Sequence, residues 1–247
     1  MTDLEHDDEL ISSPQAAFDA LRNVTPETPC PYLPGRQSRS EVYSAEQLDG
    51  ELYECLLALG FRRSGSLIYR PRCRRCRECR QLRIMVDEFS PSRGMRRVHR
   101  LNVDVNVAMS KPTPTDEKFA VFKDYLDAQH DDTMSRSYDA FHDFLYDSPL
   151  ETWEFEYRLG KRLIGVSIAD QCSNGLSSVY MYFDPAFGSR SLGTLSVLHE
   201  TEYCRTRGLS YYYLGFYVAG SRTMAYKARF KPNQVLVGND RWVAFRE

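Results

Sequence analysis

Three cysteines spaced two residues apart lie within a run of arginines in segment 70–83, RPRCRRCRECRQLR. Thiols at the spacing of Cys73, Cys76 and Cys79 can ligate a soft metal ion if a fourth ligand comes from elsewhere, and Cys30 is the candidate. The bound group would be a structural zinc ion or an iron–sulfur cluster, and the alternative is three reduced thiols in a basic loop. The chain has seven cysteines, an odd number, which favours metal ligands or free thiols over disulfides.

Positive charge is concentrated around these cysteines. Residues 61–100 carry 13 arginines and 3 acidic residues, whereas the whole chain has a net charge of -2. Such a block is often a solvated face, but an excess of this size is costly unless an anionic partner neutralises it, and RNA phosphate is the natural partner. The arginines that we expect to contact RNA are Arg62, Arg63, Arg74, Arg75 and Arg77.

A second group of residues follows a predicted strand that ends at Asp184 and Pro185. A loop comes next, and small residues then open a helix at Leu192, Gly193 and Thr194. Free backbone N–H groups at the start of a helix can face an anion or a developing oxyanion. An enzyme that binds acetyl-coenzyme A would carry another small residue where this chain has a leucine at position 195, and this departure argues against bound coenzyme A.

A third group is cationic. Lys227, Arg229 and Lys231 alternate within the otherwise apolar stretch 224–232, so we expect their side chains on one side of the chain. If that side lines a cleft, these cations would hold a carboxylate or the phosphates of an RNA 3′ end.

The elements that position these residues follow from hydrophobic periodicity. The pattern predicts an α+β fold with a helix on a mixed sheet. A proline-rich break at 111–115 separates a predicted N-terminal domain, residues 1–110, from a C-terminal one, residues 115–247. Helices are predicted at 45–59, 117–129 and 195–207, and strands at 65–69, 82–86, 153–159, 163–170, 177–183 and from 211.

The first ten residues contain five acidic side chains and no lysine or arginine. They therefore lack the positive start and apolar stretch of a signal peptide, and the chain has no apolar run of about 20 residues that would span a bilayer. We expect a cytoplasmic protein with no membrane partner.

Short stretches along nearly the whole chain resemble the arginyl/leucyl-tRNA-protein transferase family, and within it the bacterial aspartate/glutamate leucyltransferases. Each stretch is short, but their combination and order are specific. They are CPYLP at 30–34, GFRRSG at 60–65, YRP at 69–71, SSVY at 177–180, YFDP at 182–185, SLGT at 191–194, YYLG at 212–215 and YKA at 226–228.

This resemblance implies a small N-terminal cysteine-containing domain and a C-terminal domain with an acetyltransferase-like (GNAT-like) fold. The donor would be aminoacyl-tRNA, with Leu-tRNA favoured, and the acceptors would be proteins that begin with Asp or Glu. The product would be a degradation signal of the N-end rule pathway. Eukaryotic relatives place metal-binding cysteines where this chain has Leu33 and Glu78, so the metal site of those relatives does not carry over intact.

The chemistry that the resemblance implies needs no cofactor, because aminoacyl-tRNA is already an activated ester. We expect Asp170 or Asp184 to hold the incoming ammonium group or accept its proton. Tyr180 or Tyr182, with the N–H groups at 192–194, would polarise the ester. The residues expected to bind the acidic side chain are Arg190, Lys227 and Arg229.

Three alternatives remain open at the level of the sequence. The first is that the donor is Arg-tRNA instead of Leu-tRNA. The second is that the chain is a non-catalytic RNA-binding adaptor. An ordinary acetyl-coenzyme A acetyltransferase is the third and is disfavoured by Leu195.

Overall fold

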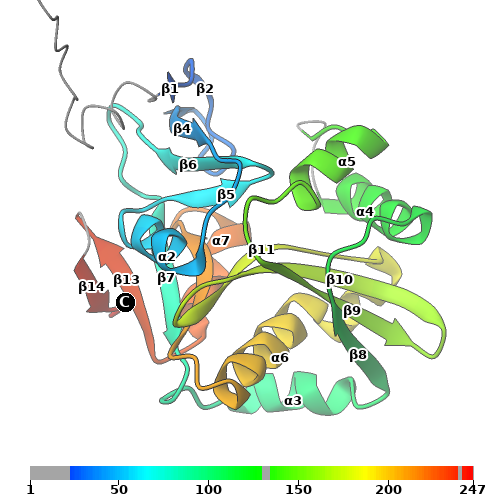
Figure 1. Cartoon of the computed structure of the whole chain (residues 1–247). Helices are drawn as coiled ribbons and strands as arrows, with labels where there is room; N and C mark the ends of the chain where they lie inside the picture. Colours follow the sequence, from blue (N-terminus) through cyan, green and yellow to red (C-terminus); the bar gives the residue numbers. More distant parts are fainter. Residues whose placement is uncertain (1–22, 130–133, 239–240, 247) are drawn as a thin grey trace, which may run out of the picture.

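The computed structural model describes residues 23–129, 134–238 and 241–246. Its centre is an eight-stranded sheet in the order β14-β13-β7-β12-β11-β10-β9-β8 (Figure 1). The sheet is mixed because β11 and β12 run parallel, whereas the other neighbouring pairs are antiparallel. Its strands are β7 (Arg80–Met85), β8 (Val105–Ser110), β9 (Thr152–Leu159), β10 (Arg162–Gln171), β11 (Gly175–Phe183), β12 (Tyr211–Tyr217), β13 (Asn233–Val237) and β14 (Arg241–Ala244).

Helices cover both faces of this sheet. On one face α6 (Leu192–Thr206) packs against it, with α3 (Arg93–Leu101) beside α6 (Figure 1). On the other face α4 (Asp116–Gln129) and α5 (Tyr138–Leu145) enclose a core that includes Val166 and Ile168 of β10. These two residues lie two apart in a strand, so their side chains share a face. The predicted mixed sheet with helices is confirmed.

A smaller four-stranded sheet lies above the large one in Figure 1. Its order is β1 (Asn23–Val24), β4 (Ser40–Ser44), β6 (Leu67–Pro71) and β5 (Arg62–Ser64), and a two-stranded ribbon joins β2 (Thr28–Pro29) to β3 (Gln37–Ser38). Helix α2 (Gly50–Ala58) packs in a core with Phe61 and Ile68 of this region and Tyr213 of β12. The small sheet is therefore packed on the large one through shared core residues.

The helix ends follow local chemistry. Asp49 caps α2 by accepting a hydrogen bond from the backbone N–H of Leu52 at 2.7 Å, so this helix begins later than its apolar pattern predicts. Gly208 follows α6 with a φ of 69°. Because such a φ favours glycine, Gly208 ends the helix where the sequence predicts.

The large sheet draws strands from both sides of the predicted domain boundary at 110–115. β7 lies between β13 and β12, and β8 forms an edge next to β9. The division into two domains stays a prediction, but this sheet cannot be assigned to the C-terminal part alone. In the described part of the chain, no helix is both long and apolar enough to cross a membrane.

One predicted local geometry is wrong. Lys227 and Arg229 lie in a 3-10 turn, η2 (Tyr226–Arg229), which follows the short helix α7 (Arg222–Ala225). In a 3-10 turn side chains repeat every three residues, so alternation does not place these cations on one side.

Candidate functional site at the separation of two strands

The parallel strands β11 and β12 pair for only three residues and then separate. Their register runs from Gly175 opposite Tyr211 to Ser177 opposite Tyr213. Beyond that point β11 pairs only with β10, and β12 pairs only with β7. The β10–β11 pair and the β7–β12 pair each have a shift in register close to the point of separation. The backbone groups of β11 and β12 that face each other beyond this point can therefore bind groups other than a neighbouring strand. The separation lies at the carboxyl ends of these two parallel strands, which is where ligands bind in α/β sheets.

Arg62 reaches this point of separation from β5 of the small sheet. Its Nη1 donates to Ser177 Oγ at 2.9 Å, and its Nη2 donates to the backbone oxygen of Ser178. Gly215 of β12 makes room for it, since a Cβ there would lie 3.4 Å from Nη2. Arg62 is only 5% exposed, so it is not the surface tRNA contact that the sequence predicts.

Lys227 reaches the same strands from η2. Its Nζ donates to the backbone oxygen of Phe216 at 3.2 Å. Burial and the nearby positive charge of Arg62 lower the pKa of Lys227 to about 7. Among the described residues, neither Lys227 nor Arg62 forms an ion pair. Two cations therefore meet at the separating strands with no carboxylate of the described chain to balance them.

Arg229 joins η2 to the first turns of α6. Its Nη2 donates to Thr194 Oγ1, and its guanidinium lies 5.3 Å from the ring centre of Tyr226. The backbone N–H of Thr194 donates to Ser191 O at 2.8 Å. This N–H is therefore not available to a substrate oxygen. Within the described residues, the amides of Leu192 and Gly193 have no partner, and a Cβ on Gly193 would meet nothing within 4 Å.

Asp170, one of the two predicted proton acceptors, is in the wrong place for that role. Its side chain is fully buried and accepts hydrogen bonds from Arg63 at 2.8 and 3.0 Å and from Thr152 at 2.7 Å. Arg63 is equally buried. A carboxylate held this way is a structural counter-ion, and Arg63 cannot touch a tRNA from this position.

Asp184 has a local structural task. Its Oδ1 accepts from the backbone N–H of Ala186 at 2.9 Å and so caps the 3-10 helix η1 (Pro185–Arg190). Its Oδ2 pairs with Arg162 at 2.6 Å. Both carboxylate oxygens therefore have partners, and the predicted proton transfer by Asp184 would have to displace one of them.

The two predicted tyrosines lie on the α4 and α5 face of β11. Tyr182 is fully buried, and its hydroxyl is 3.3 Å from that of Tyr146. Burial raises its pKa. Tyr180 is half-buried, with its ring 6.2 Å from that of Tyr125 and 5.1 Å from that of Phe144, and burial raises its pKa as well. Of the two side chains, Tyr180 is the more exposed.

Arg190 is held by a carboxylate of its own chain. Its two terminal nitrogens bond Asp104 at 2.7 and 2.9 Å, and this hydrogen-bonded pair raises the pKa of Arg190. The predicted role of Arg190 in binding an acidic substrate would require it to exchange this partner. The pair instead ties the end of α3 to η1.

The four predicted metal ligands gather beside the small sheet. Arg36 donates to Cys76 Sγ at 3.3 Å, and Cys73 Sγ lies 3.9 Å from the backbone oxygen of Arg39. Burial and the neighbouring thiols of Cys30, Cys73 and Cys76 raise the pKa of Cys79 to about 12. However, no three His, Cys, Asp or Glu side chains of the described residues are arranged to hold a metal ion. The zinc ion or iron–sulfur cluster stays a prediction, which metal analysis of the purified protein tests.

The remaining predicted RNA contacts lie in segment 70–83, which contains three cysteines and is called the cysteine segment below. Arg74 pairs with Glu27 at 3.2 Å, with 69% of its side chain exposed. Arg75 is exposed, and Arg77 is exposed but donates to the backbone oxygen of Cys76 at 2.8 Å. These three arginines remain accessible to a polyanion.

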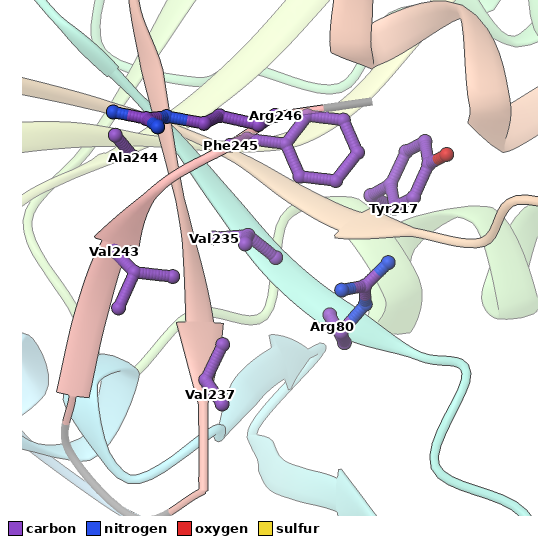
Figure 2. Close-up of a pocket in the computed structure, with 8 residues that line it drawn as sticks. All are labelled: Arg80, Tyr217, Val235, Val237, Val243, Ala244, Phe245 and Arg246. Carbon is purple, nitrogen blue, oxygen red and sulfur yellow. The ribbon is translucent and has the colours of Figure 1, made fainter.

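Two cavities contain none of the predicted site residues. One, of about 340 Å³, lies along β13 and β14 and is lined by Arg80, Tyr217 and Phe245 among others (Figure 2). The other, of about 420 Å³, lies between α3 and α6. Helix α3 was not predicted from the sequence, although Ser92 before a basic run is a helix-start signal. The serine that binds Arg62, Ser177, was not predicted as a site residue either.

Comparison with known proteins identifies relatives of the whole chain. A family model of the C terminus of arginine-tRNA-protein transferases matches residues 117–237, and a model of their N terminus matches residues 28–97. A protein of Nitrobacter winogradskyi named aspartate/glutamate leucyltransferase is 41% identical over 228 residues, which cover 86% of this chain and 88% of that protein. A protein of the same name from Hahella chejuensis is 35% identical, with 89% of this chain and 95% of that protein covered.

Among solved structures, that of FemX has a TM-score of 0.43 and 11% identity, and covers 66% of this chain and 59% of that one. A likeness at this score supports no statement about site or fold. The two family models and the identity to full-length relatives suffice without it: the chain belongs to the arginine-tRNA-protein transferase family.

Proposed function

We propose that the chain transfers the leucyl group of Leu-tRNA to proteins whose N-terminal residue is Asp or Glu. Relatives at about 40% identity carry the name of that activity. The observation that carries the acceptor preference is the pair of cations Arg62 and Lys227 at the separation of β11 and β12, which have no carboxylate partner in the part of the chain that the structure describes. An acidic side chain entering there would supply the missing carboxylate, and hydrogen bonds between ionised groups are strong in such a buried place.

In this reaction the α-amine of the acceptor attacks the carbonyl carbon of the leucyl ester. An amide bond forms between that carbon and the acceptor nitrogen, the ester bond to the tRNA ribose breaks, and the amine proton passes to the departing ribose oxygen. Binding the two reactants in register supplies most of the acceleration. The amides of Leu192 and Gly193 at the start of α6 suit the carbonyl oxygen as it gains charge.

Lys227 binds the acceptor carboxylate, with Arg62 behind it. Arg229 holds η2 against Thr194 and so keeps Lys227 in position. Tyr180 lines the α4 side of β11, where it can contact the substrates. Asp170 and Tyr182 have no direct part, since both are fully buried, and Arg190 and Asp184 act by fixing η1.

The donor preference follows from the apolar surroundings of this site. The ring of Tyr125 lies 5.0 Å from that of Phe183, and its pKa is raised by burial and by the nearby Tyr226. A leucyl side chain suits such aromatic surroundings, whereas an arginyl side chain would be buried without a carboxylate partner. The separating parallel strands beside α6 also support the acetyltransferase-like architecture that the family resemblance implies.

The exposed side chains of Arg74, Arg75 and Arg77 are the proposed tRNA contacts of the N-terminal part. The proposed reaction takes place in the cytoplasm. Its product, the new N-terminus, marks the protein for degradation. The test offers both charged tRNAs, Leu-tRNA and Arg-tRNA, to the protein with a peptide that begins with Asp. We expect the peptide to gain one leucine. A gain of arginine would establish the other donor, and an unchanged peptide mass with intact tRNA binding would leave only an RNA-binding adaptor.

A further inference from the structure

Helix α3 carries a dense row of exposed cations. Its side chains Arg93, Arg96, Arg97 and Arg100 are exposed, while Met95 is buried against the core and Val98 packs partly against it. Ser92 caps the helix by accepting from the backbone N–H of Met95 at 3.4 Å. The helix is thus anchored by one apolar edge and presents the rest of its surface as positive charge.

Most other arginines of the basic block are already used within the protein. Arg70 and Arg72 both bond Glu41, at 2.8 and 2.6 Å. Arg83 lies 3.6 Å from the ring centre of Tyr211 and donates to Gln234 at 2.9 Å. Together with the buried Arg62 and Arg63, these side chains contribute little to an external partner. The exposed part of this positive charge therefore lies mainly on α3 and on the cysteine segment.

Among the described residues, the cations of α3 have no carboxylate partner. Among the residues that the structure describes, Arg93, Arg97 and Arg100 form no ion pair or hydrogen bond through their side chains. Arg96 donates to the backbone oxygen of Pro91. Repulsion among four neighbouring arginines is a cost that an anionic ligand would remove.

A cavity of about 420 Å³ runs between α3 and α6 next to these cations. Arg96, His99 and Arg100 line it from α3, and Arg205 lines it from α6. The one carboxylate among its lining residues, Glu202, is paired with Arg205 at 2.5 Å. The cavity is thus open, basic and of a size that admits a phosphate with its sugar.

The same helix is fixed to the start of α6. Asn102, which ends α3, donates to the backbone oxygen of Arg190 at 2.9 Å, and Arg190 in turn holds Asp104. Hydrogen bonds therefore link the end of α3 to the segment that leads into Leu192 and Gly193.

We propose that α3 and the cavity between α3 and α6 bind the phosphodiester backbone of tRNA. This surface rests on the transferase activity proposed above and adds to it a binding site outside the cysteine segment. Phosphate contacts position a nucleic acid without reading its sequence, so the surface would serve any tRNA offered.

The experiment measures binding of uncharged tRNA by fluorescence anisotropy from about 50 to 200 mM NaCl. The double variant Arg97→Gln/Arg100→Gln removes two exposed charges of α3. We expect its affinity at low salt to fall on the order of tenfold and the slope of log K against log salt to lose about 2 in magnitude. The matched control Lys123→Gln/Lys161→Gln removes the same charge from exposed positions on α4 and the β9–β10 turn and should leave the slope unchanged.

A second readout separates this surface from the reaction itself. Leucyl-adenosine carries the same ester but no phosphate, so transfer from it to an Asp-initiated peptide should be equal in the wild type and the α3 variant. If both double variants weaken tRNA binding equally, the effect is one of net charge and the α3 site is refuted. If tRNA binds normally to the α3 variant, the site is refuted even when transfer is intact, and absence of transfer in the wild type refutes the activity alone.

Discussion

Arg63 and Asp170 join the two sheets through a buried ion pair. Arg63 lies in β5 of the small sheet and Asp170 in β10 of the large one, and their two hydrogen bonds of 2.8 and 3.0 Å have no access to solvent. Thr152 supplies a further bond to the same carboxylate. This arrangement fixes β5 above β10, and β5 also carries Arg62 to the separation of β11 and β12. The pair is therefore a structural support of the proposed site.

Asp170→Asn should be strongly destabilising, because it leaves the Arg63 guanidinium buried without its counter-ion. We expect a loss of about 3 to 5 kcal/mol in the free energy of unfolding, measured by urea denaturation. Asp184→Asn is the control: it weakens a pair whose arginine is 63% exposed and keeps a good capping residue, so about 1 kcal/mol or less should be lost. Equal losses in the two variants would contradict the structural role of Asp170.

Glu200 should make stability depend on pH. It is fully buried on α6, and burial raises its pKa to about 7 in spite of hydrogen bonds from Ser167 and Tyr212. Because the folded pKa lies above the unfolded value, its stabilising contribution is complete below about pH 4.5 and is lost as the pH rises through 7. The full change corresponds to about 3 kcal/mol.

Other carboxylates change stability in the opposite direction, so the measurement is the difference between the wild type and Glu200→Gln. The amide cannot ionise, and we expect the variant to gain stability relative to the wild type between pH 5 and 8 by urea denaturation. A constant difference over this range would mean that Glu200 keeps an ordinary pKa.

Gly215→Ala should disturb the point where β12 turns away from β11. Gly215 has a φ of 82°, a backbone conformation that is strained for a residue with a Cβ, and a Cβ there would contact the Arg62 guanidinium at 3.4 Å. We expect a loss of about 1 to 2 kcal/mol in thermal or urea unfolding. Gly188→Ala is the matched control, since its Cβ meets nothing within 4 Å and its φ is not positive. Two variants of the same stability would show that the position tolerates a side chain.

The acceptor preference should weaken with rising pH. The pKa of Lys227 is lowered to about 7, so its positive charge is lost as the pH rises above that value. We expect the ratio of kcat/KM for an Asp-initiated peptide to that for an Asn-initiated peptide to fall between pH 7 and 9. Deprotonation of the acceptor amine affects both peptides, and the ratio removes its contribution. A ratio independent of pH would exclude Lys227 as the group that binds the carboxylate.

The elements could be predicted from the sequence where local periodicity is strong. The alternation in 153–159 and 163–170 predicted β9 and β10 within one residue at each end, and Gly208 marked the end of α6. Strand pairing could not be predicted in this way. The position of β7 between β12 and β13 depends on contacts distant in sequence, which local periodicity does not contain.

The candidate site was predicted only in part. The sequence identified Lys227, Gly193 and the basic block, but it gave no sign of which charged side chains point inward. Arg62 and Arg63 look like surface charges in the sequence, yet both are buried because Ser177 and Asp170 lie opposite them. A burial decided by residues more than a hundred positions away leaves no local pattern.

Lys227, at the separation of β11 and β12, is the residue proposed to bind the acidic side chain of the acceptor. The most direct test is the specificity ratio, kcat/KM for an Asp-initiated peptide over that for an Asn-initiated one, with Leu-tRNA as donor in the wild type and in Lys227→Gln. Loss of one charge-assisted hydrogen bond corresponds to about 1.5 to 3 kcal/mol, so the ratio should fall about 10- to 100-fold in the variant while transfer to the Asn peptide changes little. An unchanged ratio, with activity towards both peptides retained, would show that Lys227 does not bind the acceptor carboxylate.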